Sequence, residues 1–167
     1  SLGNFFTVRE VLESYPAEVV RYFLTSAHYR SPLDFSDQAL DQAKAAYDRL
    51  RLGVFNMARI ITAGQQSAEE HSGRSAALRA LVETAETDFR IAMDEDFNTP
   101  QAIAVLFNLV SEANRLIGDP SFTPDAAALK ALSDARAVTL LLADTLGIKL
   151  VTAAKEEDTL TPQLMDL

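Results

Sequence analysis

Apolar residues recur every three or four positions along most of the chain, which is the spacing of one face of an α-helix. The first long stripe follows Ser36, a residue type favoured at helix N-caps, and it lasts until Gly64. Four such stripes can be traced, and each needs apolar partners. Because four helices can enclose a core, the pattern predicts an all-α fold whose main part is a four-helix bundle. The stripes are Leu40, Ala43, Tyr47, Leu50, Val54, Met57 and Ile61; Leu78, Val82, Ala85, Phe89 and Ala92; Ile103, Phe107, Val110, Ala113 and Ile117; and Ala128, Leu132, Ala135, Val138, Leu142 and Thr145.

Proline, glycine and hydroxyl residues mark the expected ends of these helices. Thr99-Pro100 and Thr123-Pro124 each place a side-chain oxygen at an N-cap and a proline at the first helical position. Gly147 follows the fourth stripe, where it predicts a left-handed C-terminal cap. Polar residues over 63–74 predict a surface loop. We therefore expect the bundle to occupy residues 36–150.

Residues 1–35 have a different pattern. Thr7 and Glu10 match a capping box, which predicts a short helix over 7–15. Pro16 predicts the start of a second helix, over 16–30, and Pro32 predicts an extended chain up to residue 35. We expect a small packed segment before the bundle and no fifth bundle helix. The expected apolar face of the second helix is Val20, Phe23, Leu24 and Ala27.

Composition narrows the possible functions. The chain has 24 acidic and 15 basic residues and a formal charge of -9, which disfavours nucleic-acid binding through bulk charge but permits a local basic spot. It has no cysteine and two histidines, so neither a disulfide framework nor a thiolate zinc site is expected. No apolar run is long enough to span a bilayer. A soluble, cytoplasmic protein is expected.

One helix face carries residues suited to a phosphate backbone. Arg21, Thr25 and His28 are spaced at i, i+4 and i+7, and Arg30 follows. The residues alone favour a structural alternative, in which Arg21 pairs with a neighbouring carboxylate while His28 and Arg30 lie favourably at the negative end of the helix dipole.

The acidic run Asp94-Glu95-Asp96 also has two interpretations. A calcium loop needs alternating oxygen ligands and a distal Glu, whereas Phe97 and a helix start follow here. Acidic residues are also favoured just before a helix, where the dipole stabilises them. We adopt the second interpretation, and we predict no catalytic residue and no metal site. His71 is expected to be solvated.

Three stretches resemble the class I cysteinyl-tRNA synthetases: "SLGNFFTVREVL", "PAEVVRYFLTSAHYRSPLDFS" and "AMDEDFNTPQAIAVLFNLVSEANRL". The resemblance covers the chain from its start to about Leu116. It places Ser1 at the end of the family's lysine loop, which holds ATP phosphates, so that Ser1, Gly3 and Asn4 border the nucleotide loop. Residues 17–21 stand at the family's Asp-Ala-Leu-Arg type motif, and Pro16 precedes it where many relatives have Asp.

The resemblance implies a division of the chain and a partner. Residues 1–35 are expected to be a stem-contact segment, residues 36–150 a DALR-type tRNA-binding bundle, and residues 151–167 a linker truncated before an anticodon-reading subdomain. The implied partners are tRNA(Cys), through Arg21, Thr25, His28 and Arg30, and the catalytic domain of the same chain. ATP and zinc would belong to the intact enzyme and not to this fragment, which we expect to be inactive alone.

Two other functions stay open on the sequence. A related family ligates cysteine to an amino-sugar in thiol biosynthesis and has a similar helical end without using tRNA. An acidic bundle is also suited to binding a protein partner without catalysis.

Overall fold

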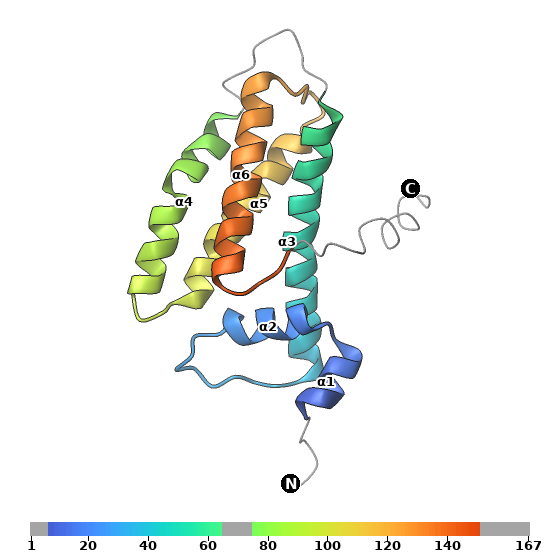
Figure 1. The fold of residues 1–167 in the computed structure, drawn as a ribbon, viewed down its shortest axis with the longest axis vertical. Helices are drawn as coiled ribbons and strands as arrows, with labels where there is room; N and C mark the ends of the chain where they lie inside the picture. The colour runs from blue at the N-terminus through green and yellow to red at the C-terminus, as the bar shows by residue number, and fades with distance from the viewer. Residues whose placement is uncertain (1–6, 65–74, 151–167) are drawn as a thin grey trace.

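The computed structural model describes residues 7–64 and 75–150, and this part of the chain forms helices without strands (Figure 1). The all-α prediction is therefore confirmed. The nucleotide-loop residues Ser1, Gly3 and Asn4, the loop residue His71 and the expected linker 151–167 lie outside the described residues. None of the described helices is both long and apolar enough to cross a membrane. The helices are α1 (Val8–Ser14), α2 (Ala17–Ser26), α3 (Asp37–Ala63), α4 (Ala76–Asp94), α5 (Thr99–Ile117) and α6 (Ala126–Thr145).

The last four of these helices form the predicted bundle. They run alternately up and down along the long axis of the molecule (Figure 1). Helices α5 and α6 contact each other, and each also contacts α3 and α4. Within the described residues α3 and α4 do not contact each other, although they follow one another in the sequence. Helices α3 and α4 therefore occupy opposite edges of the bundle, with α5 and α6 between them.

Helix α3 confirms the first stripe. Ser36 caps it by accepting a hydrogen bond from the Ala39 amide, and Gly64 ends it with a φ of 61°. Residues spaced by three and four face the neighbouring helices, and the larger ones are almost completely buried. These buried residues are Leu40, Ala43, Tyr47, Leu50, Val54 and Met57.

Two helix starts differ from the predicted ones. Asn98, not Thr99, caps α5 by accepting from the Gln101 amide at 3.2 Å. Asp125, and not Thr123, caps α6 by accepting from the Ala128 amide at 2.7 Å. Several amides at a helix start lack an intrahelical acceptor, so a proline is tolerated at more than one position there. Asn and Asp are also strong capping residues, which explains the shift.

The end of α6 is a Schellman motif, as Gly147 predicts. The Gly147 amide donates to the Asp144 carbonyl and the Ile148 amide to the Ala143 carbonyl, both at 2.8 Å. Gly147 has a φ of 72°, and Ile148 is buried, which supplies the apolar contact typical of this motif. Beyond the motif, the Tyr47 hydroxyl in α3 donates a hydrogen bond to the backbone carbonyl of Lys149 at 2.6 Å. Burial raises the pKa of Tyr47, which keeps this donor protonated.

Helix α1 has the capping box that the sequence predicts: Thr7 and Glu10 exchange hydrogen bonds at its start. Directly after α1, the Tyr15 hydroxyl donates to the Asp41 carboxylate at 2.8 Å. This bond raises the pKa of Tyr15 and ties the α1–α2 connection to the first turns of α3.

Helix α2 differs from its prediction in length and in buried face. It ends at Ser26, not at residue 30, and the hydroxyls of Thr25 and Ser26 donate to carbonyls of its own last turn. The buried residues are Val19, Tyr22 and Phe23, whereas Leu24 is 54% exposed. The expected face was wrong by about one position because α2 lies across both α3 and α5.

Helices α3 and α5 approach each other closely at Gly53. A Cβ atom at this position would lie 2.1 Å from Val110 Cγ1 in α5. One turn later the Asn56 side-chain amide donates to the Asn114 side-chain oxygen at 3.1 Å. Glycine is therefore required here because it has no side chain to separate α3 from α5, and not because of its backbone freedom.

We predict that Gly53→Ala lowers the free energy of unfolding by about 1–3 kcal/mol, because it overpacks the contact with α5. Alanine normally stabilises a helix relative to glycine, so the loss has the opposite sign to the effect of helix propensity. Urea unfolding measures it. In a Val110→Ala background the loss should shrink or reverse; an equal loss in both backgrounds would contradict the packing explanation.

We predict that Gly147→Ala costs about 1–2 kcal/mol of stability, because a Cβ atom disfavours the left-handed conformation. Steric crowding does not cause this loss, because the added Cβ atom would lie 3.6 Å from Arg21 Cδ, which is an ordinary van der Waals distance. Gly147→Asn should cost less in the same urea unfolding experiment, because asparagine tolerates this conformation. If the Asn and Ala variants are equally unstable, the conformational explanation fails.

Candidate functional site

The predicted phosphate-binding residues do not share one helix face. His28 and Arg30 lie beyond the end of α2, so the expected i, i+4, i+7 arrangement of Arg21, Thr25 and His28 is wrong for His28. Arg21 and Thr25 remain on the helix, and both have partners within the fold. The Arg21 Nη1 donates to the Gly147 carbonyl at 3.2 Å, and the Thr25 hydroxyl donates to the Arg21 and Tyr22 carbonyls at 2.9 and 3.1 Å.

Arg21 therefore links α2 to the end of α6. Its guanidinium binds a carbonyl that the Schellman motif leaves exposed, which is a favourable place for a cation at a helix C-terminus. The structural alternative for Arg21 was a neighbouring carboxylate; its partner is instead a backbone carbonyl 126 residues away in the sequence.

His28 and Arg30 meet at a second place, which we call the Asp96 corner: His28, Tyr29, Arg30, Asp96 and Phe97. The Tyr29 hydroxyl and the Arg30 Nη2 both donate to Asp96 Oδ1, at 2.7 and 3.1 Å. The Arg30 Nε also donates to the Tyr29 hydroxyl, and His28 Nε2 lies 3.9 Å from Asp96 Oδ2. The connection from α2 to α3 is thus bound to the turn between α4 and α5.

The turn that carries Asp96 is unusual. Asp96 and Phe97 have φ values of 57° and 52°, so two successive residues other than glycine are left-handed. The turn is closed by backbone bonds: the Phe97 amide donates to the Met93 carbonyl and the Asn98 amide to the Ala92 carbonyl, both at 3.0 Å. Strained turns of this kind gather at functional sites.

The acidic run has a role that the sequence interpretation missed. Asp96 accepts hydrogen bonds from the Tyr29 and Arg30 side chains and lies near His28, so it is not only a charge placed before a helix. No three His, Cys, Asp or Glu side chains gather as a metal site within the described ranges. Aspartate tolerates the left-handed region, which is a weak signal in the sequence; nothing in the sequence indicates it for Phe97.

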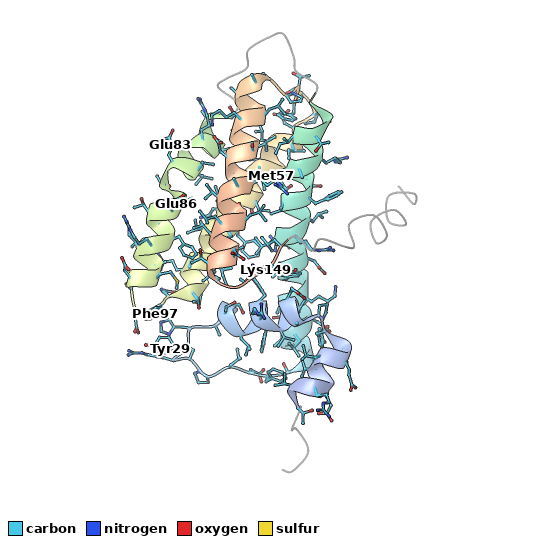
Figure 2. All side chains as sticks on the ribbon, viewed as in Figure 1. Tyr29, Met57, Glu83, Glu86, Phe97 and Lys149 are labelled. Carbon is cyan, nitrogen blue, oxygen red and sulfur yellow. The ribbon has the colours of Figure 1, made fainter. Side chains whose placement is uncertain are left out.

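Aromatic and apolar side chains remain exposed at the Asp96 corner. Tyr29 is 61% exposed and Phe97 is 66% exposed, and the two lie near each other where residues 28–30 approach the α4–α5 turn (Figure 2). The His28 and Tyr29 rings stack with centroids 5.0 Å apart, and the Arg30 guanidinium lies 5.3 Å from the centre of the Tyr29 ring. The corner thus offers aromatic faces beside cationic hydrogen-bond donors.

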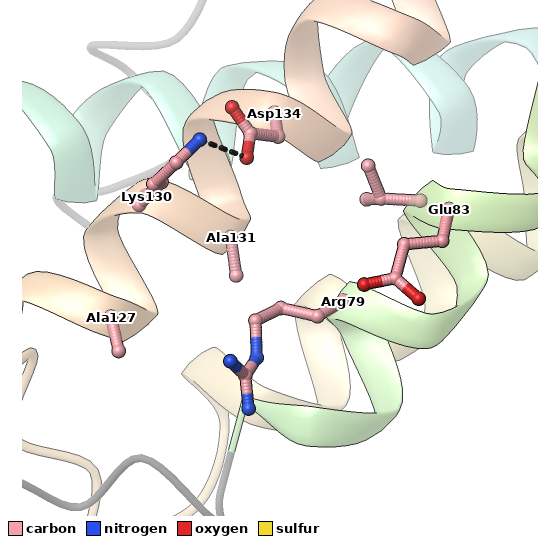
Figure 3. Close-up of a pocket in the computed structure, with 7 residues that line it drawn as sticks. Arg79, Glu83, Ala127, Lys130, Ala131 and Asp134 are labelled. Carbon is pink, nitrogen blue, oxygen red and sulfur yellow. Dashed lines mark hydrogen bonds and ion pairs between the residues drawn. The ribbon is translucent and has the colours of Figure 1, made fainter.

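A hollow of about 350 Å³ lies between α4 and α6 (Figure 3). Arg79 and Glu83 line it from α4, and Lys130 and Asp134 line it from α6, where they form an ion pair at 2.6 Å. Its charges are mixed, and its lining contains no hydroxyl, thiol or imidazole group. Lys130 and Asp134 are paired with each other and are 75% and 43% exposed, so neither is held as an activated nucleophile, and we do not regard this hollow as the functional site.

Comparison with known protein families matches two parts of the chain. Residues 1–45 match the family described as the class I (C) tRNA synthetase catalytic domain, and residues 88–151 match the family described as the DALR domain. Within the Asp96 corner, Tyr29 lies in the first matched range, and Asp96 and Phe97 lie in the second.

Curated relatives share one name, cysteine–tRNA ligase. The protein from Geobacter metallireducens is 50% identical over 71% of this chain, which is 24% of its own length. Those from Desulfitobacterium hafniense and Heliobacterium modesticaldum are 41% and 40% identical over 95% and 100% of this chain. The chain spans 32% and 35% of their lengths, about a third. It therefore belongs to the cysteine–tRNA ligase family.

Proposed function

We propose that this chain is the tRNA-docking part of an enzyme that joins cysteine to tRNA(Cys) at the expense of ATP. The observation that carries the proposal is that a class I catalytic-domain match and a DALR-domain match occur in one folded unit. The name shared by relatives that align with 95% and 100% of the chain supports the choice of cysteine.

The proposed roles follow from where the described residues lie. Helices α1 and α2 would connect the nucleotide-binding part of the enzyme, bordered by Ser1, Gly3 and Asn4, to the bundle. Arg30 and His28, both outside the helices and partly exposed, are the candidates for direct phosphate contact. Arg21 would act indirectly, by holding α2 against the end of α6. Residues 1–35 would be the stem-contact segment and 36–150 the tRNA-binding bundle.

The remaining requirements of the reaction belong to the rest of the enzyme. ATP would be bound mainly by the catalytic domain of the same longer chain. Zinc does not fit this part, because the sequence has no cysteine and only two histidines. The chain alone would therefore be inactive, and the cytoplasm, where tRNA is charged, would be its location.

Binding of the 167-residue chain to tRNA(Cys) tests the proposal. We expect weak binding that favours tRNA(Cys) over a non-cognate tRNA and weakens as salt rises, because phosphate contacts release counterions. Filter binding or fluorescence anisotropy over a salt series measures it. If neither tRNA binds at low salt, the chain does not dock tRNA and the proposal is wrong.

Arg30→Ala in a full-length ligase containing this chain should raise the KM for tRNA(Cys) and leave ATP–pyrophosphate exchange unchanged, because adenylate formation does not need the docking surface. In binding assays it should reduce the salt slope by about one. Lys130→Ala is a matched control, since Lys130 is also exposed and paired with an aspartate, but at the start of α6. Equal effects of both substitutions would refute a local contact at Arg30.

A further inference from the structure

An open hollow of about 440 Å³ adjoins the Asp96 corner. It is lined by Leu24, Thr25 and Ala27 from α2 and the residue after it, by Tyr29, and by Phe97 and Thr99 from the α4–α5 turn and the start of α5. Its volume is within the range of ligand sites. The three large side chains around it are 54%, 61% and 66% exposed, so the hollow has apolar walls that face solvent.

The position of Phe97 is not explained by burial. A phenylalanine is disfavoured in the left-handed region, yet the turn holds Phe97 there and leaves the ring mostly exposed. Residues held in this region cluster at active sites and ligand clamps, which makes the turn a candidate ligand site.

Tyr29 is fixed in place from its polar edge. Its hydroxyl donates to Asp96 and accepts from Arg30, and His28 stacks on its ring. The ring therefore loses little further conformational entropy on binding, which is the advantage of a preorganised contact.

We propose that this hollow binds one unpaired nucleobase of the RNA, stacked on Phe97 and Tyr29. The inference rests on the proposed function, which supplies an RNA ligand. Base stacking on aromatic side chains is the common way in which proteins hold unpaired nucleotides. The residues that line the hollow include no cationic side chain, so the hollow suits the base, and Arg30 beside Tyr29 is the candidate for contact with its phosphate.

The hydroxyls around the hollow set a base preference. Thr25 donates its proton to the Arg21 and Tyr22 carbonyls, and Thr99 donates its proton to the Ala27 carbonyl at 3.4 Å. Each hydroxyl then offers only acceptor lone pairs to a ligand. The exocyclic amino groups of adenine, cytosine and guanine can donate to such acceptors, whereas uracil has only its ring N3–H, so a base with an amino group is preferred over uracil.

The test uses the absence of tryptophan from the chain. Phe97→Trp introduces a single tryptophan that keeps a stacking face, and Phe97→Leu removes the face but keeps an apolar side chain. With tRNA(Cys), Phe97→Trp should bind like the wild type and show quenched fluorescence. Phe97→Leu should bind roughly 5- to 100-fold more weakly, the range given by the loss of one stacked base.

Three controls make the result specific. The salt slope should be the same for Phe97→Leu and wild type, because stacking releases no counterions. Leu141→Ala, at a residue that is 55% exposed on α6, should leave affinity unchanged. Single-stranded oligoadenylate should quench Phe97→Trp more strongly than oligouridylate.

The outcomes separate this inference from the proposed function. If the wild type and Phe97→Leu bind tRNA(Cys) equally, the stacking site is refuted and tRNA docking stands. If neither binds any RNA, both are refuted. If RNA leaves the fluorescence of Phe97→Trp unchanged and only the remainder of the ligase shifts it, the hollow is a protein contact and the inference is wrong.

Discussion

The structure depends on one uninterrupted helix, α3, which contacts both α2 in the N-terminal segment and the bundle helices α5 and α6. Helix α3 has 27 residues, about 40 Å at the rise of an α-helix. Helix α2 and the Tyr15 hydroxyl contact the N-terminal part of α3, and α5 and α6 contact the part that follows. Since the backbone hydrogen bonds of α3 continue through both regions, α2 and the bundle are positioned by one rigid element and not by a flexible connection.

Two further contacts fix the orientation of α2 on this helix. Arg21 reaches the end of α6, and residues 28–30 reach the Asp96 turn, so α2 is bound at its middle and just after its end. Arg30 and Asp96 are largely exposed, and ion pairs of this kind contribute about 0–1 kcal/mol. Their main effect is to orient the Tyr29 ring and the cations beside it rather than to stabilise the fold.

Periodic features were predictable from the sequence, and features made by distant residues were not. The α3 stripe, the Thr7–Glu10 capping box and the left-handed Gly147 were expected because each depends on residues a few positions apart. The buried face of α2 was assigned wrongly because it is selected by α3 and α5 together. The partners of Arg21 and Arg30 lie 126 and 66 residues away, beyond any local pattern. The left-handed Phe97 has no sequence signal, although it forms part of the proposed site.

The arrangement of the bundle also has a kinetic consequence. Within the described residues α3 does not touch α4, the bundle helix that follows it, so these two cannot form an early helical hairpin. The pairs α4–α5 and α5–α6 are neighbours both in the sequence and in space, and local contacts of this kind form fastest. We expect α4, α5 and α6 to assemble first and α3 to dock on them later, bringing α2 with it. During synthesis on the ribosome, α3 would therefore emerge well before α5 and α6, its partners in the bundle.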